Sequence, residues 1–545
     1  MKSFAFFTGI FVMLALSSNM QAQYTHQDTL RGSLNPARNW WNVLYYDLEV
    51  APDYASKTIT GSNRIRFEWL STSPRGLMQI DLQQPMTIDS IHYKNKSLKF
   101  SRDGNAWLIK WPPVHHTATE EIIIYFHGKP REAIRAPWDG GWVWAKDDLG
   151  RPWMTVACQG LGASVWYPCK DHQSDEPDQG ASLTITVADS LVAVGNGKLF
   201  QKQANGNGMT SWTWKVSNPI NNYNIVPYIG KYVNWTEEFS GEKGKLNCSY
   251  WVLDYNLQKS KDQFGRDVKL MLQCFENWFG PYPFYDDDYK LVESSHLGME
   301  HQSAVAYGNK YMNGYLGMDL SSTGWGTGWD YIIVHESGHE WFANSITTKD
   351  IADMWVHEGF TNYSEVLFVE CQNGKQAANE YCRGLRQNIE NNKPVIGPYG
   401  VNKEGSDDMY AKGANLIHTI RQVINDDAKF KSILRGLNQT YFHKTTTSKE
   451  VEAYISKQAG KDLSKIFTQY LRTTRIPVLE YRASPTEIRY RWTNCIKGFD
   501  MPVRMLCGNK DLWLRPTGNW QQQKLPSPEP VVADSNFYIG IREIK

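Results

Sequence analysis

The amino-acid sequence predicts an α+β protein of several domains, because the spacing of its apolar residues changes twice along 545 residues. Up to about residue 250, apolar and polar residues alternate, as at Ile65 and Phe67, which is typical of half-buried strands. From Phe264 to Phe279 the apolar residues instead recur at helical spacing. After Pro477 the alternation returns, together with frequent turn-forming residues.

These changes give the expected domain boundaries. A chain of this length has room for three or four domains of about 150 residues each. We expect a β-rich N-terminal domain at residues 23–252, a mainly helical central domain at 253–475 and a small, β-sandwich-like C-terminal domain at 476–545.

Each region carries its own local signals. In the N-terminal region, Leu183, Ile185 and Val187 alternate with threonines, as expected for a strand with one buried face. The first helical segment is followed by Gly280-Pro281, a helix stop signal. Further helical patterns lie at residues 330–345, at 415–425, and after Thr447, which has the capping-box spacing to Glu450.

The composition is that of a neutral globular protein. Lys and Arg number 58 against 57 Asp and Glu, so the net charge is +1 and nothing favours nucleic acid as a partner. Hydrophobic residues make up 41% of the chain, which is enough for buried cores and argues against intrinsic disorder.

The first residues resemble an export signal. Met1-Lys2-Ser3 precedes an apolar run from Phe4 to Leu16, and Ala22 offers a small residue before a cleavage point at Gln23. We therefore expect residues 1–22 to be a signal peptide. No later stretch has 18 uninterrupted apolar residues, so we expect a mature chain without a membrane span, in a periplasm or outside the cell.

Eight cysteines in an exported chain have 105 complete pairings, and their spacing contains no C-x-x-C cluster. The two local pairs, Cys495 with Cys507 and Cys371 with Cys382, are the first candidates for disulfides. Reduced, buried cysteines are the alternative.

The most informative segment is His335-Glu336-Ser337-Gly338-His339, an H-E-x-x-H sequence inside a helical pattern. On a helix the two histidines lie one turn apart on the same face, so both imidazoles can bind one zinc ion. Glu336 lies beside them, where a carboxylate can take a proton from an attacking water molecule. The alternative is an exposed helix with two solvated histidines.

A third ligand favours the metal site. Glu358 follows His339 after eighteen residues, and two His with one Glu leave a fourth position open, as in catalytic zinc sites. A structural site would instead be closed by cysteines. We expect one Zn²⁺ per chain, with a degenerate site that no longer holds metal as the alternative.

At these residues the sequence resembles the zinc aminopeptidases that include aminopeptidase N and the leukotriene hydrolase, a group of gluzincin metallopeptidases. His335 to Thr347 is similar to the family's H-E-x-x-H-x-W-F-G-N-x-x-T, and Trp355 to Tyr363 to its W-L-N-E-G-F-x-x-Y, with His357 in place of Asn. The resemblance implies a thermolysin-like α/β catalytic domain at 253–475. Many relatives continue into a long helical domain, for which residues 476–545 are too few.

The resemblance also implies a site for a free N-terminus. Gly298-Met299-Glu300-His301 resembles the family's G-x-M-E-N, in which the Glu binds the substrate's α-ammonium group, although His301 replaces the Asn. A carboxylate that binds this cation fixes the first peptide bond over the metal. We therefore expect Gly298, Met299 and Glu300 to bind substrate.

Two more residues follow from the same resemblance. Gln159 precedes Pro168-Cys169-Lys170-Asp171 as in the family's Q-x8-P-C-x-D, and is expected to accept a hydrogen bond from the same amine. Tyr410 lies in a segment similar to the family's Y-x-K-G, in which the phenol stabilises the oxyanion. Without the resemblance, Gln159 would be interpreted as a surface glutamine on a strand and Tyr410 as a residue that packs in the core.

The sequence therefore predicts a zinc aminopeptidase that acts on peptides with a free N-terminus. Within enzymes, the alternatives are a zinc endopeptidase and an epoxide or amide hydrolase on the same scaffold. The alternative outside enzymes is a catalytically silent protein that binds peptides or glycans, although such a protein would not need Glu336.

Overall fold

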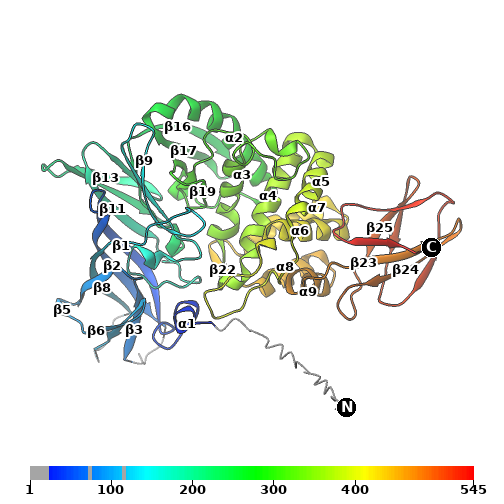
Figure 1. Cartoon of the computed structure of the whole chain (residues 1–545), viewed down its shortest axis with the longest axis horizontal. Helices are drawn as coiled ribbons and strands as arrows, with labels where there is room; N and C mark the ends of the chain where they lie inside the picture. Colours follow the sequence, from blue (N-terminus) through cyan, green and yellow to red (C-terminus); the bar gives the residue numbers. More distant parts are fainter. Residues whose placement is uncertain (1–23, 71–75, 113–117, 545) are drawn as a thin grey trace, which may run out of the picture.

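The computed structural model describes residues 24–70, 76–112 and 118–544. Three lobes follow one another along the chain: a β-rich N-terminal domain, a helical centre and a small C-terminal β domain (Figure 1). The α+β fold class expected from the sequence is confirmed. The proposed signal peptide at residues 1–22 lies outside the described residues. Among the residues described, no helix is both long and apolar enough to cross a membrane.

The N-terminal domain begins with helix α1 (His26–Gly32) and is built on an eight-stranded sheet in the order β13-β14-β11-β1-β2-β8-β4-β5. The strands are β1 (Trp41–Asp53), β2 (Thr58–Trp69), β4 (Thr87–Tyr93), β5 (Lys96–Ser97), β8 (Thr119–Gly128), β11 (Ala181–Ala188), β13 (Lys198–Ala204) and β14 (Met209–Val216). The expected alternation is present, because Leu183, Ile185 and Val187 of β11 are buried in one core with Leu48 and Val50 of β1.

Two smaller sheets complete this domain. One has the order β3-β7-β6 and the other β12-β15-β10-β9. Their strands are β3 (Leu77–Asp81), β6 (Phe100–Asp103), β7 (Ala106–Lys110), β9 (Gly141–Lys146), β10 (Pro152–Ala157), β12 (Val192–Val194) and β15 (Tyr228–Gly230). The turn after β10 leads to Gln159 at the edge of the central domain.

The central domain combines a five-stranded sheet, β16-β17-β18-β20-β19, with a group of helices. The strands are β16 (Tyr232–Gly241), β17 (Gly244–Leu253), β18 (Tyr289–Glu293), β19 (Gly298–Met299) and β20 (Val305–Tyr307). Because β17 pairs in parallel with β18, this sheet takes strands from both sides of residue 252, where the sequence pattern changes.

The helices of the centre include both metal-binding segments. They are α2 (Leu257–Phe279), α3 (Tyr331–Gly338), α4 (Trp355–Asn373), α5 (Lys375–Gly384), α6 (Ala411–Ile424), α7 (Asp427–Thr440), α8 (Ser448–Ala459) and α9 (Ser464–Arg472). The short strands β21 (Ile346–Thr348) and β22 (Lys444–Thr446) pair in parallel. The capping box expected at Thr447 and Glu450 begins α8. The helix expected over 330–345 instead ends at Gly338 and continues as a kinked turn.

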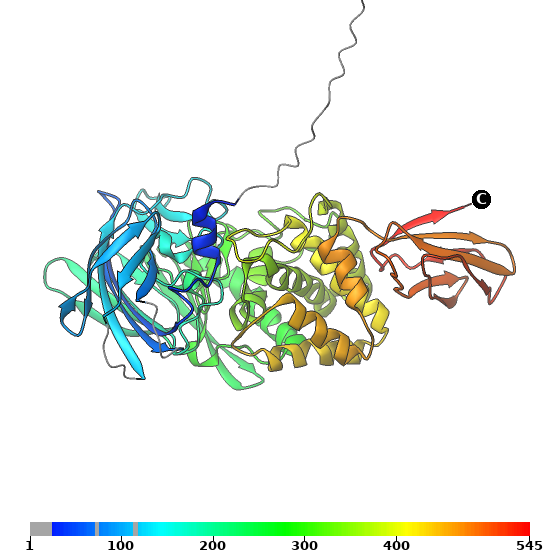
Figure 2. The ribbon, with the colours of Figure 1, turned by 90° about the horizontal axis from the view of Figure 1, so that it is seen from below.

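The C-terminal domain consists of two small sheets, β27-β24-β23-β29 and β26-β25-β28. The strands are β23 (Val478–Ala483), β24 (Glu487–Thr493), β25 (Val503–Cys507), β26 (Lys510–Leu514), β27 (Gln521–Lys524), β28 (Val531–Ala533) and β29 (Gly540–Glu543). Leu479 and Trp492 belong to the same hydrophobic core as the central helices. The domain therefore packs on the far side of the centre from the N-terminal domain (Figure 2).

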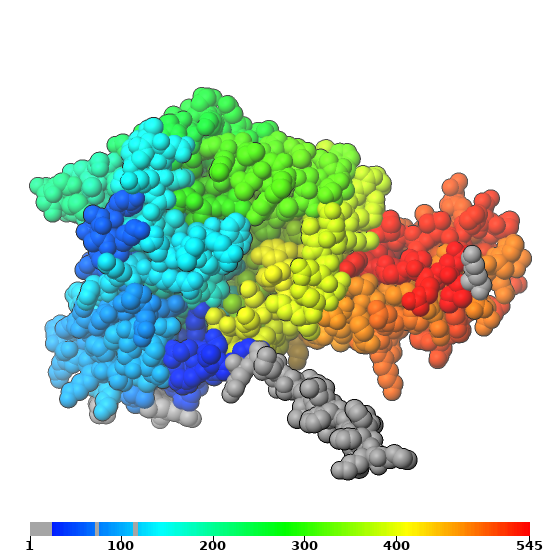
Figure 3. All heavy atoms as spheres, viewed as in Figure 1, coloured from blue at the N-terminus to red at the C-terminus, as the bar shows by residue number. Residues whose placement is uncertain are grey.

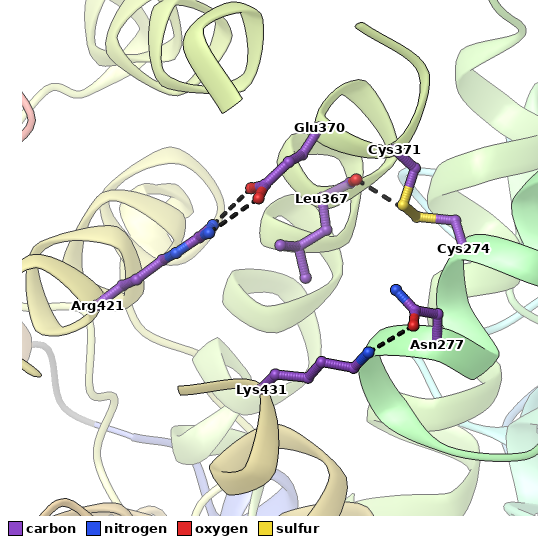
Figure 4. The surroundings of a disulfide bond; sticks show 7 residues. All are labelled: Cys274, Asn277, Leu367, Glu370, Cys371, Arg421 and Lys431. Atoms are coloured by element: carbon purple, nitrogen blue, oxygen red, sulfur yellow. Dashed lines mark hydrogen bonds and ion pairs between the residues drawn. A yellow bond between two sulfur atoms is a disulfide. The ribbon is translucent and has the colours of Figure 1, made fainter. Parts of the chain in front are cut away.

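One disulfide links Cys274 of α2 to Cys371 at the end of α4 (Figure 4). Both local pairings expected from the sequence are wrong, since Cys382, Cys495 and Cys507 are unpaired in the described structure. Tertiary packing of α2 on α4 places Cys274 beside Cys371, a partner 97 residues away that local spacing does not indicate.

Candidate active site

Helix α3 is held at its start by a buried aspartate. The carboxylate of Asp330 accepts hydrogen bonds from the backbone N–H groups of Ile332 and Ile333, which is an N-cap. The side chains of Gln263 and Tyr307 also donate to Asp330. These contacts fix the helix that carries His335 and His339.

The predicted metal ligands lie together. His335 and His339 are one turn apart, and their Nε2 atoms lie 3.7 and 3.3 Å from Oε2 of Glu358, in the first turn of α4. One donor atom from each of the three residues lies within 4.8 Å of the others. All three side chains are buried.

The other ring nitrogens show how the imidazoles are oriented. His335 Nδ1 lies 2.7 Å from the carboxylate of Glu365, and His339 Nδ1 lies 3.1 Å from the carbonyl oxygen of Phe342. Because each Nδ1 faces an acceptor and donates its hydrogen there, each Nε2 is available to bind a metal ion beside Glu358.

The residues present fit a zinc ion. Among the described residues, none donates a well-formed hydrogen bond to Glu358 Oε2, although this oxygen is buried. A buried carboxylate oxygen without a donor is costly unless a cation faces it. Two neutral imidazoles and one carboxylate make a catalytic zinc set with an open fourth position. His335, His339 and Glu358 are therefore the residues that would hold zinc.

Glu336 lies beside the donor set and lines the same cavity. Burial raises the pKa of Glu336 to about 7, a value suited to accepting and then releasing a proton near neutral pH. Gly298 of β19 makes room for this carboxylate, because a Cβ atom on Gly298 would lie 2.5 Å from Oε1 of Glu336.

Glu300 is held by residues of both domains. Its Oε1 accepts hydrogen bonds from Gln159 Nε2 at 2.6 Å and from the hydroxyl of Tyr223 at 2.9 Å. Its backbone carbonyl accepts a hydrogen bond from Asn344 at 2.8 Å. Gln159 donates through its amide nitrogen, so its amide oxygen is the atom that can accept a hydrogen bond from an ammonium group.

Tyr410 precedes α6, and its ring stacks at 6.1 Å from that of His335. Burial raises the pKa of Tyr410 well above its usual value, so the phenol remains a hydrogen-bond donor. Two glycines bring Tyr410 to the metal ligands: a Cβ on Gly413 would lie 2.8 Å from Cα of Gly359, which follows Glu358 in α4. Any side chain there would separate α6 from α4.

The two histidines that depart from the resemblance both have structural contacts. His301 Nδ1 hydrogen-bonds with the hydroxyl of Tyr228. His357 Nε2 accepts a hydrogen bond from the backbone N–H of Thr348. Burial lowers the pKa of His357 to about 3, so its ring is neutral, as an acceptor must be.

The predicted site residues line one cavity of about 710 Å³. Its lining contains every site residue expected from the sequence: Gln159, Gly298, Met299, Glu300, His335, Glu336, His339, Glu358 and Tyr410. The cavity lies where the N-terminal and central domains meet.

Three contributors were missed by the sequence analysis: Tyr223, Asn344 and Glu365. Glu365 carries a readable signal, because it follows Glu358 by two helical turns and therefore shares its face of α4. Asn344 is the Asn of the quoted stretch His335 to Thr347, but that stretch does not indicate its contact with Glu300. Tyr223 reaches Glu300 only through tertiary packing, and no spacing in the sequence relates the two.

Comparison with known proteins agrees with this geometry. Residues 264–470 match the peptidase family M1 domain. The central region is thus similar to this domain.

The curated relatives have low sequence identity to this chain but align with most of its length. Aminopeptidase N of Lactococcus lactis subsp. lactis is 23% identical over 459 residues, covering 80% of this chain and 51% of the relative. Endoplasmic reticulum aminopeptidase 1 of Mus musculus is 22% identical over 483 residues, covering 81% of this chain and 50% of the relative. The chain thus spans about half the length of these relatives.

A solved structure shows the same fold. The M1 zinc metallopeptidase of Deinococcus radiodurans, as a mutant bound to a Tyr-Ser-Ala substrate, superposes with a TM-score of 0.67 at 19% identity. The match covers 80% of this chain and 95% of that chain. The arrangement of a β-rich N-terminal domain before a helical central domain is therefore shared.

The contact between Glu365 and His335 should tune zinc affinity. We expect Glu365→Gln to fold normally but to bind zinc about 10–100-fold more weakly, because outer partners of a metal-ligating histidine typically contribute that much. Competitive titration against a chromogenic zinc chelator measures the change. Glu380→Gln on α5, where the carboxylate contacts Trp325 and Gln376, is the control. Equal affinities for the two variants would contradict this role.

Proposed function

We propose that the chain is a zinc-dependent aminopeptidase that removes the N-terminal residue from peptides. One observation carries the proposal: the buried carboxylate of Glu300, held by Gln159 and Tyr223, faces the same cavity as the His335, His339 and Glu358 donors. A carboxylate beside a zinc site is suited to binding the α-ammonium group of a free N-terminus.

When bound, zinc polarises the scissile carbonyl and makes water a better nucleophile at neutral pH. Glu336 takes a proton from the attacking water and transfers it to the amine that leaves, and its pKa of about 7 suits both steps. Gly298 leaves the space in which this carboxylate moves. The products are one amino acid and a shortened peptide.

Tyr410 and Glu300 act on different parts of the substrate. The protonated phenol of Tyr410 donates a hydrogen bond to the negative charge that develops on the carbonyl oxygen, an effect worth about 3–4 kcal/mol for one donor. Glu300 and Gln159 hold the amine. Donor atoms of Glu300, Glu336 and His339 lie within 4.8 Å of one another, so we expect one residue to fit between this anchor and the reacting carbonyl.

The amine anchor favours an aminopeptidase over the other functions that the sequence leaves open. An endopeptidase, or an epoxide or amide hydrolase, would not need a buried carboxylate for an ammonium group. A silent binding protein for peptides or glycans would not need Glu336 with a pKa near 7.

We further propose that the mature chain is exported to a periplasm or outside the cell. The charged start and short apolar run at Phe4 to Leu16 support export, and the Cys274–Cys371 disulfide is of the kind that persists in oxidising compartments. We expect amino-terminal sequencing of the mature protein to begin at Gln23. Cys274 and Cys371 should resist alkylation until a reductant is added. An uncleaved chain with both thiols reactive would contradict export.

The proposed activity is tested with amino-acid anilides that carry a free or an acetylated amine. We expect only the unblocked anilides to release the chromogenic amine, because acetylation removes the charge that Glu300 binds. Glu336→Gln should lower kcat by about 10²–10⁴-fold, the usual contribution of a general base.

The outcomes separate the alternatives. Equal cleavage of blocked and unblocked substrates would contradict the amine anchor and indicate an endopeptidase or amidase. Zinc-loaded protein that cleaves no anilide or peptide in the panel would indicate a binding protein.

Gly298→Ala should impair catalysis although it removes no charged group. The new methyl group would lie 2.5 Å from Glu336 Oε1, so the carboxylate must shift, and we expect kcat to fall about 10²-fold. The matched control is Gly265→Ala in α2, where a Cβ would meet no atom within 4 Å. Steady-state kinetics on the best unblocked anilide measures both, and a wild-type kcat for Gly298→Ala would show that Glu336 tolerates the shift.

A further inference from the structure

Helix α1 lies at the junction of the N-terminal and central domains (Figure 2). Its first turn is held by the N-terminal domain: His26 Nε2 lies 2.8 Å from a carboxylate oxygen of Asp103, and Gln27 accepts a hydrogen bond from the backbone of Asn105 at 3.0 Å. In the space-filling view, α1 in dark blue touches the yellow surface of the central domain (Figure 3).

The other end of α1 meets loops that line the active-site cavity. Arg31 Nη1 donates to the carbonyl oxygen of Gly160 at 2.8 Å, and Asn402 Nδ2 donates to the same oxygen at 3.2 Å. The backbone N–H of Asn402 donates to the carbonyl of Asp28 at 3.1 Å. Gln159, Gly160 and Asn402 all line the cavity. The carbonyl oxygen of Gly160 therefore joins α1, the turn that carries Gln159 and the central-domain loop that carries Asn402.

Arg31 also reaches a buried carboxylate. Its Nε lies 3.3 Å from Oδ2 of Asp171, which accepts hydrogen bonds from the hydroxyl and the backbone N–H of Ser164. A Cβ on Gly162 would lie 2.2 Å from Nη2 of Arg31 and 2.1 Å from Oδ2 of Asp171, so this glycine leaves the space that the ion pair occupies. The guanidinium therefore packs against the turn while its side chain remains 21% exposed.

The turn is built on two glycines with positive φ angles, 69° at Gly160 and 99° at Gly162. The backbone N–H of Gly162 closes it on the carbonyl of Cys158 at 2.6 Å, whereas the carbonyl of Gly160 points to Arg31 and Asn402. The position of this turn decides whether Gln159 Nε2 stays 2.6 Å from the carboxylate of Glu300. Arginine suits this position because its planar fork can bind a carbonyl and a carboxylate in two directions at once.

We propose that Arg31 is a positioning residue that holds the Gln159 turn against Glu300, and so sets the affinity for the substrate's free amine. The inference rests on the proposed function, because it assigns the amine to Glu300 and Gln159. Arg31 acts through the Gly160 carbonyl and Asp171 and does not contact the reacting atoms. Arg31 thus has two partners in this turn region, the carbonyl of Gly160 and the carboxylate of Asp171, which is the Asp of the P-C-x-D sequence.

Arg31→Ala is the test. We expect KM for the best unblocked anilide to rise about 10-fold while kcat stays within about twofold, because binding common to ground and transition states is lost. Competitive inhibition by L-leucine should weaken by a similar factor. Inhibition by 4-methylpentanoate, which differs from L-leucine only in lacking the amine, should not change.

Two further variants make the test specific. Arg31→Lys keeps the charge but cannot span Gly160 and Asp171, so it should fall between the wild type and Arg31→Ala, and it tests the proposal even if Arg31→Ala does not fold. Arg64→Ala removes an exposed arginine that pairs with Glu121 in the same domain, and should behave as the wild type. Thermal unfolding of each variant checks that the fold is retained.

Equal weakening of L-leucine and 4-methylpentanoate, or wild-type KM values for Arg31→Ala, would overturn the proposal. A wild-type protein that cleaves no unblocked anilide would instead refute the proposed function. The ratio of the two inhibitor affinities, measured by binding, would still decide the role of Arg31 in that case.

Discussion

Buried negative charge is the constraint around which this structure is organised. Glu300, Glu336, Glu358 and Glu365 are all buried within one region of the central domain. A buried carboxylate is tolerated only where donors or cations compensate it. Glu365 has three partners, namely His335, Asn362 and Tyr381, and Glu300 has Gln159 and Tyr223. Glu358 faces the Nε2 atoms of His335 and His339, and a zinc ion bound among these three residues would offset its charge.

Close helix packing turns this requirement into a fixed geometry. A Cβ on Gly338 would lie 2.5 Å from Oγ of Ser364, and one on Gly413 would lie 2.8 Å from Cα of Gly359. These glycines let α3 and α6 approach α4 more closely than side chains would allow. Because Glu358 is next to Gly359, the same contacts that pack the helices set the separation of the metal donors and of Tyr410.

The sequence predicted what depends on local spacing and failed where distant segments meet. His335, His339 and Glu358 could be found because helical periodicity puts the histidines on one face and the motif supplies the third ligand. The Cys274–Cys371 pair could not, because 97 residues separate its members and only the packing of α2 on α4 joins them.

The backbone beyond the zinc helix shows the same limit. The pattern over 330–345 predicted one helix, yet Phe342 and Ala343 leave helical geometry. Ala343 has a φ of 150°, which costs of the order of 1–3 kcal/mol for a residue with a side chain and is kept only where surrounding contacts impose it. Those contacts come from residues far away in the chain, so helical periodicity alone has no means of indicating the break.

The break after the zinc helix also aligns the two domains. The carbonyl of Phe342 orients His339, and the carbonyl of Ala343 accepts a hydrogen bond from Asn221 of the N-terminal domain at 3.0 Å. Asn344 donates to the backbone of Glu300 and accepts from Asn224 at 2.6 Å. Three consecutive residues therefore connect His339, Glu300 and the neighbouring domain. A shift between the domains would move Glu300 and His339 together and keep the distance between them constant. In the proposed function, that distance decides which peptide bond lies over the metal.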